Sequence, residues 1–217
     1  MNQPLDILIL EDRLSDALLL LRELRRGGFT INHLVVDNAA DLKSALEETE
    51  WDLILSDYSM PGFDATAALK IVQTYGLDLP VIVVSGIVGE DAAVAAMKAG
   101  ARDFFSKDKL TRLVPAVERE LREAAQRRRR HEAEARFATA FHASPVGIAI
   151  SRLADGQLLD VNARFLEIFG YTRNDIIGAS DTGSELWAQP EQHDQIVKQL
   201  RQAGAVRNVE IAVKKKG

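Results

Sequence analysis

Short apolar runs that alternate with helix-like segments constrain the fold of this chain more than any other feature. The runs recur about every 20–25 residues through the first half of the chain, the spacing of βαβ units. Five of them are predicted to be strands, over residues 5–10, 31–36, 53–56, 80–85 and 102–106. The sequence therefore predicts an α/β fold with a parallel sheet and right-handed crossovers.

Helical periodicity fills the intervals between these runs. The predicted helices span 12–26, 38–46, 64–75 and 89–100, and glycines follow several of them. In the first helix, one face is expected to carry Leu14, Leu18, Leu21 and Leu24. Asn38 is expected to cap the second helix.

Polar residues follow four of the runs at the point where each strand would end. They are Glu11, Asp12, Asp57, Ser85, Gly86 and Lys107. Taken singly, an acid or a hydroxyl at a strand end usually caps the next helix. Because parallel strands end at one edge of a sheet, the set converges in one crevice, and the combination indicates a site.

The residue types in this set suit phosphoryl transfer. Clustered carboxylates raise one another's pKa, and a hard cation such as Mg²⁺ relieves the repulsion through oxygen ligands. A central carboxylate, Asp57, can attack phosphorus and form an aspartyl phosphate. Mg²⁺, Lys107 and the Ser85 hydroxyl can then neutralise the phosphoryl oxygens.

Residues 5–120 resemble the receiver domain of two-component response regulators. The matching motifs are Glu11-Asp12, Asp57-Tyr-Ser-Met-Pro-Gly62, Ser85-Gly86 and Phe104-Phe-Ser-Lys107. The resemblance implies a flavodoxin-like, doubly wound sheet of five strands in the order 2-1-3-4-5. It also implies that Asp57 is the phosphoacceptor for a histidine kinase or a phosphotransfer protein.

The resemblance further assigns roles within the site. Mg²⁺ would be held by Glu11, Asp12, Asp57 and Ser59, the last through its backbone carbonyl. The phosphate-binding residues would be Ser85, Gly86 and Lys107, and the conformational switch would be Ser85 with Phe104. Two departures are small: Glu11 stands where Asp is commoner, and Asp108, rather than proline, follows Lys107.

A heptad-like seam links the two halves of the chain. Spacings of four and three alternate along Leu110, Val114, Val117, Leu121, Ala124, Arg128, His131, Ala135 and Ala138. Pro115 places the start of the helix near Leu113 or Val114, since proline is tolerated in a first turn. One reading is a surface helix that packs its first half on the receiver sheet. The favoured reading is a long helix over 113–140 that pairs with a second copy as a coiled coil.

The basic run Arg127–Arg130 lies within this helix, among many glutamates. Without interleaved aromatic residues or a helix-turn-helix pattern, it does not predict nucleic-acid binding. The pair His131-Glu132 is reminiscent of a kinase dimerisation helix, but its Arg- and Ala-rich flanks argue against that assignment.

The rest of the chain resembles a PAS domain, an α+β fold. The motifs are Ser144-Pro-Val-Gly-Ile148, Asp155-Gly156, Val161-Asn-Ala-Arg-Phe165 and Gly170-Tyr-Thr-Arg-Asn-Asp-Ile-Ile-Gly178. We expect strands over 146–151, 157–161 and 207–214, helices over 162–170 and 190–203, and turns at Asp155-Gly156 and Ile176–Gly178. A PAS sheet needs about two more strands to pair its open edge, so the natural protein is expected to continue beyond Gly217.

Composition narrows the chemistry and the location. The sequence has no cysteine, which excludes disulfides, cysteine-ligated metals and flavin–thiol photochemistry. His142 and His193 are weak candidates for haem ligation, so no PAS cofactor is predicted. The first residues, Met1–Asp6, lack the basic region of a signal peptide, and no apolar run approaches the roughly 20 residues of a membrane span. A cytoplasmic location and no membrane partner are expected.

The domain assignment is a receiver over residues 1–122, a helical linker over 113–140, and an incomplete PAS-like domain over 141–217. The predicted function is that of a response regulator, not an enzyme. Phosphorylation of Asp57 would switch a homodimeric linker and PAS relay toward a downstream output. The alternatives are an input fragment of a hybrid histidine kinase or cyclic-di-GMP enzyme, and a PAS ligand sensor that the receiver modulates.

Overall fold

The computed structural model describes residues 3–86, 89–154, 156–177 and 187–216. It divides into two compact units, Met1–His131 and Glu132–Gly217. Each unit is described by itself below. Asp155 and Gly178, which belong to a predicted hairpin turn and a predicted loop turn, lie outside the described residues.

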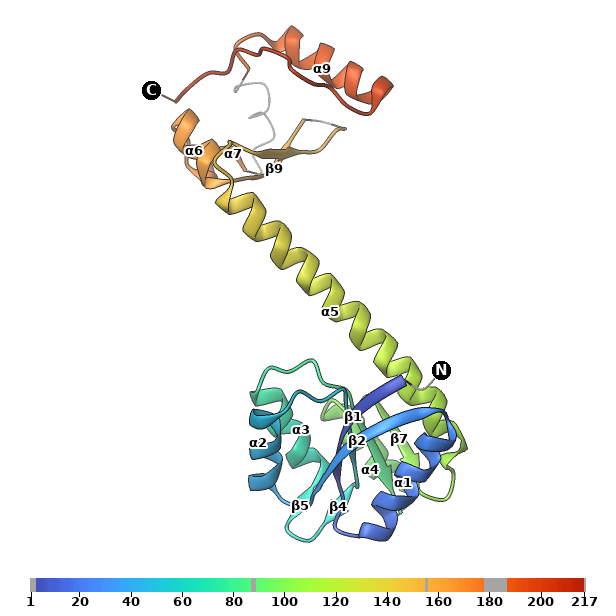
Figure 1. The fold of residues 1–217 in the computed structure, drawn as a ribbon. Coiled ribbons are helices and arrows are strands. Elements are labelled where there is room, and N and C mark those ends of the chain that lie inside the picture. The colour runs from blue at the N-terminus through green and yellow to red at the C-terminus, as the bar shows by residue number, and fades with distance from the viewer. Residues whose placement is uncertain (1–2, 87–88, 155, 178–186, 217) are drawn as a thin grey trace. The chain divides into compact units, whose positions relative to one another are not determined.

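The first unit contains the predicted parallel sheet (Figure 1). Its strands are β1 (Gln3–Leu10), β2 (Phe29–Val36), β3 (Leu53–Ser56), β6 (Val81–Ser85) and β7 (Asp103–Ser106). They pair in the order β2-β1-β3-β6-β7, and every neighbouring pair is parallel. Counted along the chain, this is the order 2-1-3-4-5, so the predicted doubly wound fold is confirmed. A short antiparallel ribbon, β4 (Ser59–Met60) with β5 (Phe63–Asp64), was not predicted.

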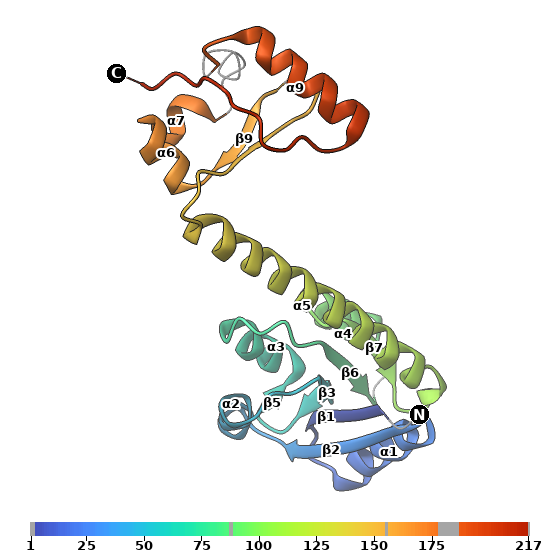
Figure 2. The same cartoon turned by 45° about the horizontal axis from the view of Figure 1, so that its top comes forward.

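Helices cover both faces of this sheet (Figure 2). They are α1 (Leu14–Arg26), α2 (Ala39–Glu48), α3 (Ala65–Thr74), α4 (Glu90–Lys98) and α5 (Leu113–Ala143), which a short 3₁₀ helix, η1 (Leu110–Arg112), precedes. Alternate residues of β1 point to opposite faces: Leu8 and Leu10 pack with α2 and α3, whereas Ile7 and Ile9 pack with α1 and α5. Burial on both faces explains why the strands are continuous apolar runs.

The buried face of α1 differs from the predicted one. The helix buries Ala17, Leu20, Leu21 and Leu24, while Leu14 and Leu18 are 67% and 51% exposed. Because residues 18 to 21 are all leucines, α1 has two overlapping apolar faces. The face that packs on the sheet is the one that includes the small residue Ala17. The predicted cap of α2 is confirmed, because the Asn38 side chain accepts hydrogen bonds from the amides of Ala40 and Asp41.

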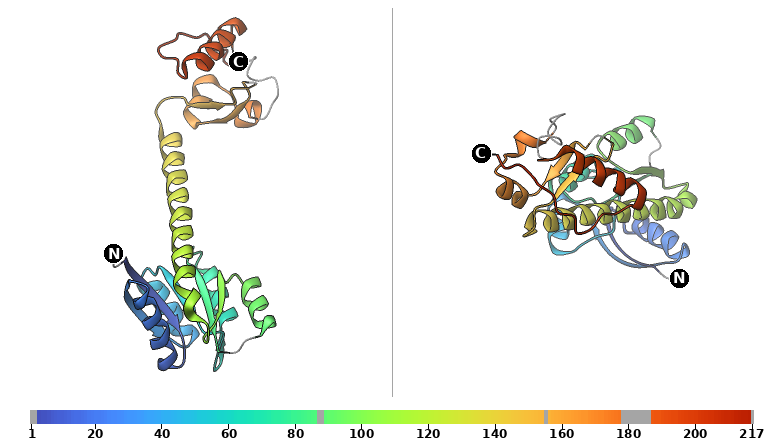
Figure 3. Two further views of the ribbon diagram at one scale, coloured as in Figure 1. Left: turned by 90° about the vertical axis from the view of Figure 1, so that its right-hand side faces the viewer. Right: turned by 90° about the horizontal axis from the view of Figure 1, so that it is seen from above.

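Helix α5 is continuous from Leu113 to Ala143 (Figure 3), and Pro115 lies in its first turn. The first half of the heptad seam packs on the sheet of its own unit: Leu110 and Val117 are buried, and Val114 and Leu121 contact the same core. From Arg128 onward, the seam residues are exposed. No helix among the described residues is both long and apolar enough to cross a membrane.

The second unit has a smaller sheet. An antiparallel hairpin, β8 (Ala149–Ser151) with β9 (Leu158–Val161), packs with α6 (Ala163–Phe169) and α7 (Arg173–Ile176). A longer helix, α9 (Pro190–Ala203), follows later in the chain. The predicted strand over 207–214 is wrong, because among the described residues this segment makes only a single bridge, between Val213 and Trp187. Its alternating pattern joins no ladder within the described part of the unit, and Val209 and Ile211 stay 46% and 44% exposed.

Candidate functional site

The predicted strand-end residues meet at one edge of the first unit's sheet. Leu10 pairs with Ser56, Ser56 with Val83 and Ser85 with Ser106, so the strands end at the same edge of the sheet, with β6 extending two residues beyond β3. The backbone pairing continues one residue further: the Asp57 amide donates to the Leu10 carbonyl at 2.7 Å, and the Lys107 amide donates to the Ser85 carbonyl at 2.8 Å. Hydrogen bonds to the neighbouring strands therefore fix the backbone positions of Asp57 and Lys107.

Three carboxylates form the acidic part of this site. One oxygen from each of Glu11, Asp12 and Asp57 lies within 4.8 Å of the others. Glu11 is buried, Asp57 is half-buried, and Asp12 is exposed. Burial raises the pKa of Glu11 and the nearby Asp57 charge adds to it, while Lys107 acts in the opposite direction. Such an all-oxygen donor set fits a hard divalent cation, so these residues are suited to hold Mg²⁺.

Lys107 lies among the carboxylates. Its Nζ is 2.7 Å from Glu11 Oε2, 2.7 Å from Asp16 Oδ2 and 3.3 Å from Asp57 Oδ2. Burial lowers the pKa of Lys107, but hydrogen bonds to Asp16 and Glu11 outweigh it, and the pKa is raised. The amine is therefore protonated and provides a positive charge beside Asp57.

A pocket of about 520 Å³ opens above this cluster. Its lining includes six of the predicted site residues, namely Asp12, Asp57, Ser59, Ser85, Gly86 and Lys107. Glu11 lies outside the lining and is only 3% exposed, yet it still contacts Lys107. The pocket is thus open to solvent over Asp57 and closed at the side of Glu11.

The proposed switch residue Phe104 contacts the site through a residue that was not predicted. In β7, Phe104 pairs with Val83, two residues before Ser85. Its ring packs edge-on against Tyr58, with centroids 6.2 Å apart. The Tyr58 amide donates to Asp57 Oδ1 at 2.8 Å. Tyr58 therefore links Asp57 to Phe104, and its position directly after Asp57 is the sequence signal that could have identified it.

Asp16 and Arg13, at the start of α1, also line the pocket and are not among the residues that the sequence predicts. A helix that follows a strand in a parallel sheet begins at the edge where that strand ends. Its first turn is therefore close to the other strand ends. An acid four residues after Asp12 is the signal that could have indicated Asp16.

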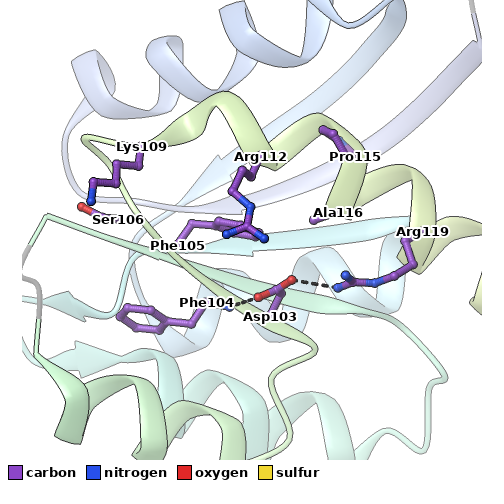
Figure 4. Close-up of a pocket in the computed structure, with 9 residues that line it drawn as sticks. All are labelled: Asp103, Phe104, Phe105, Ser106, Lys109, Arg112, Pro115, Ala116 and Arg119. Carbon is purple, nitrogen blue, oxygen red and sulfur yellow. Dashed lines mark hydrogen bonds and ion pairs between the residues drawn. The ribbon is translucent and has the colours of Figure 1, made fainter.

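A second pocket, of about 400 Å³, lies between β7 and the start of α5 (Figure 4). Here Arg119 of α5 forms an ion pair with Asp103 of β7, with 2.8 Å between Arg119 Nη2 and Asp103 Oδ2. Phe104 lines the same pocket. Strand β7 thus contacts α5 through Asp103, carries Phe104 in its middle and leads directly to Lys107.

Comparisons with known proteins agree with this geometry. A family model described as "Response regulator receiver domain" matches residues 7–118, and a model described as "PAS domain" matches residues 135–205. The first match covers the parallel sheet from the middle of β1 onward and all of the strand-end residues. The second covers the end of α5, the hairpin and the helices of the second unit.

Curated relatives match the first unit. The chain is 30% identical over 106 residues to "Transcriptional regulatory protein ZraR" of Klebsiella oxytoca, and the match covers 49% of this chain and 24% of that protein. It is 35% identical over 99 residues to "DNA-binding transcriptional regulator NtrC" of Escherichia coli (strain K12), covering 46% of this chain and 21% of that protein. The matches thus span about a quarter or less of each relative.

Among solved structures, the signal receiver domain of a Luxo repressor protein from Vibrio parahaemolyticus is similar, with a TM-score of 0.51 and 25% sequence identity. The match covers 57% of this chain and 95% of that domain. An isolated receiver domain therefore corresponds to the first unit alone.

Proposed function

Because the chain belongs, over residues 7–118, to the response regulator receiver family, we propose that it is a two-component response regulator whose phosphoacceptor is Asp57. The donor is a histidine kinase or a phosphotransfer protein. The observation that carries the proposal is the set of Glu11, Asp12 and Asp57 oxygens within 4.8 Å of one another, with Lys107 Nζ 3.3 Å from Asp57. These groups provide a nucleophile, a cation site and a fixed positive charge in one pocket.

In the proposed reaction, an Asp57 carboxylate oxygen attacks the phosphorus of a phosphohistidine. An O–P bond forms, the P–N bond breaks, and the histidine nitrogen keeps the electron pair. Bound Mg²⁺, held by Glu11, Asp12, Asp57 and the Ser59 carbonyl, would supply charge neutralisation for the phosphoryl oxygens. Lys107, the Ser85 hydroxyl and the Gly86 amide bind the remaining oxygens.

The readout uses the residues around β7. Ser85 moves toward the phosphoryl group, and Phe104 changes its packing against Tyr58 as a consequence. The Asp103–Arg119 ion pair, 2.8 Å long, supports a path from β7 to α5. Phosphorylation thereby biases a two-state equilibrium in the first unit, and α5 carries the change onward.

The experiment is a titration with beryllofluoride and Mg²⁺, which together mimic a bound phosphoryl group. The wild-type protein should bind the mimic, and Asp57→Asn should abolish binding because the carboxylate that accepts it is gone. Asp52→Asn is the matched control, since it removes the same charge next to the opposite end of β3, where Asp52 accepts a hydrogen bond from the Asp6 amide. Equal binding by wild type and Asp57→Asn, measured by calorimetry, would refute the assignment.

We further propose that the chain acts as a homodimer through the linker helix and the PAS domain. The exposed second half of the heptad seam supports this, because its residues, such as Ala135 and Ala138, have no core of their own to cover. Ala135→Glu should weaken dimers in sedimentation equilibrium, whereas Ala133→Glu, off the seam on the same exposed helix, should not. A wild-type monomer at high concentration would refute the dimer. Replacing Leu121 would be a poor test, since Leu121 packs on the first unit's core.

A further inference from the structure

We propose that Asp16 is a positioning residue that competes with the phosphoryl group on Asp57 for the ammonium of Lys107. This inference rests on the proposed phosphoacceptor role of Asp57. In the unphosphorylated protein, Asp16 holds Lys107; during phosphorylation, it must yield the lysine. Asp16 would therefore set how tightly the site binds a phosphoryl group.

Lys107 Nζ lies closer to Glu11 and Asp16 than to Asp57. Its Nζ hydrogen-bonds to Glu11 Oε2 and to Asp16 Oδ2, both at 2.7 Å, but it is 3.3 Å from Asp57 Oδ2. An ammonium has three N–H donors, and charge-assisted bonds are among the strongest that a lysine makes. Two of these donors are directed to Glu11 and Asp16, so a phosphoryl oxygen on Asp57 can form a short bond only if the ammonium moves away from these two partners.

The two acids that bind Lys107, Glu11 and Asp16, differ in how deeply they are buried. The Glu11 side chain is 1% exposed and also accepts a hydrogen bond from the Arg13 amide at 3.2 Å, so it is fixed in place. The Asp16 side chain is 27% exposed, and its further hydrogen bond, from Ser15 Oγ, is a long one of 3.3 Å. Asp16 can therefore turn into water at a lower cost than Glu11 can. Asp16 is therefore the acid that releases the lysine.

The location of Asp16 adds to its hold on Lys107. It lies in the first turn of α1, where the helix dipole favours a negative charge. The hydrogen bond from Lys107 lowers the pKa of Asp16, so the carboxylate stays ionised and keeps its attraction at neutral pH. Removing this charge should leave Lys107 more available to an anion on Asp57.

The test compares the affinity of the full chain for beryllofluoride, at saturating Mg²⁺, between wild type and Asp16→Asn. We expect Asp16→Asn to bind the mimic about 3- to 10-fold more tightly, the range of the net contribution of about one intramolecular hydrogen bond. Asp41→Asn is the matched control, because Asp41 is also the third residue of a helix and also lies in its first turn. It should leave the affinity unchanged. Asp16→Ser serves as a second neutral variant and should behave like Asp16→Asn.

Repeating the comparison in a Lys107→Gln protein distinguishes two explanations for tighter binding. Asp16 either competes for Lys107 or simply adds negative charge near the site. If Asp16 acts through Lys107, Asp16→Asn should no longer tighten binding in that background. The same gain with and without Lys107 would overturn the inference, and so would equal affinities of wild type and Asp16→Asn. Failure of the wild type to bind beryllofluoride is a different result, since it would refute the phosphoacceptor role itself.

Discussion

The two units differ in what fills their interiors. The first unit buries long aliphatic side chains on both faces of its sheet, with Leu8 and Ile54 on one face and Ile9 and Leu55 on the other, all fully buried. In the second unit, the buried apolar cluster among the described residues consists of Leu158, Val161 and Ile176. A five-stranded sheet between helices thus builds a deep core, whereas a two-stranded hairpin must rely on other interactions.

A buried polar residue takes the central place in the second unit. Asn162 has no exposed surface. Its Nδ2 donates to the carbonyls of Phe141 and Val146, at 3.0 and 2.9 Å, and its Oδ1 accepts from the amides of Ile148 and Phe165, both at 2.9 Å. One amide therefore joins the end of α5, the segment before β8 and the first turn of α6. The first unit is thus stabilised mainly by the large apolar area that it buries. The second unit depends more on the hydrogen bonds of one buried side chain, Asn162.

The largest expected effect is in the apolar core of the first unit. Leu55→Ala should lower the free energy of unfolding of that unit by about 4 kcal/mol, because it removes buried methylene groups and leaves a cavity. Trp51 lies in the first unit and Trp187 in the second, and they are the two tryptophans of the sequence, so denaturation can be followed in each unit by fluorescence after the other is changed to phenylalanine. Leu159→Ala, at a position 44% exposed in β9, is the control and should change little.

The next effect concerns the polar hub. Asn162→Ala should destabilise the second unit by about 3 kcal/mol, since it leaves buried backbone groups without partners. Trp187 fluorescence should show that the second unit unfolds at a lower denaturant concentration than in wild type. Trp51 fluorescence should show unchanged unfolding of the first unit. Asn174→Ala, at an exposed asparagine in α7, serves as the control. A stable second unit in Asn162→Ala would mean that its few apolar contacts suffice.

The smallest effect involves an ion pair in each unit. In the first, Arg127 Nε is 2.8 Å from Asp78 Oδ2, and its hydrogen bond lowers the pKa of Asp78. In the second, Lys216 Nζ is 2.7 Å from Asp175 Oδ2 and lowers the pKa of Asp175. A carboxylate with a lowered folded-state pKa adds stability above its unfolded pKa and loses it as pH falls through the folded value.

Asp78→Asn should therefore lower the stability of the first unit by about 0.5 kcal/mol at neutral pH, a value typical of an exposed ion pair. The difference in the free energy of unfolding between wild type and Asp78→Asn should disappear as pH falls below the ordinary aspartate pKa of 3.8. Asp175→Asn should leave the first unit unchanged at every pH, which makes it the control. A gap that persists in acid, measured by denaturant titration, would show that Asp78 acts through packing and not through its charge.

The sequence could predict the strand-end site because a parallel sheet leaves little freedom at its edge. Once β1, β3, β6 and β7 are recognised, Glu11, Asp57 and Lys107 can lie in only one place. Asp16 could not be placed in this way, because its direction depends on how α1 is rotated about its axis. With Leu14 and Leu18 on the core face, Asp16 would point to solvent. The observed face contains Leu20, one turn beyond Asp16, and this rotation turns Asp16 toward Lys107.

The last predicted strand failed for a similar reason. Alternation along 207–214 describes which side chains suit a sheet face, but a strand also needs a neighbour with free backbone groups. In the described part of the second unit, the segment finds only Trp187. Periodicity is local, whereas helix rotation and strand pairing are settled by contacts between elements.

The continued backbone pairing at the sheet edge has a consequence for hydrogen exchange. The amide protons of Asp57 and Lys107 are held by the carbonyls of Leu10 and Ser85, although the side chains of both residues line an open pocket. These two amides should exchange with solvent as slowly as the central strands do, and far more slowly than the Asp12 amide beside them. Protection at Asp57 would therefore report global opening of the sheet, and Asp57 would keep its position for as long as the first unit stays folded.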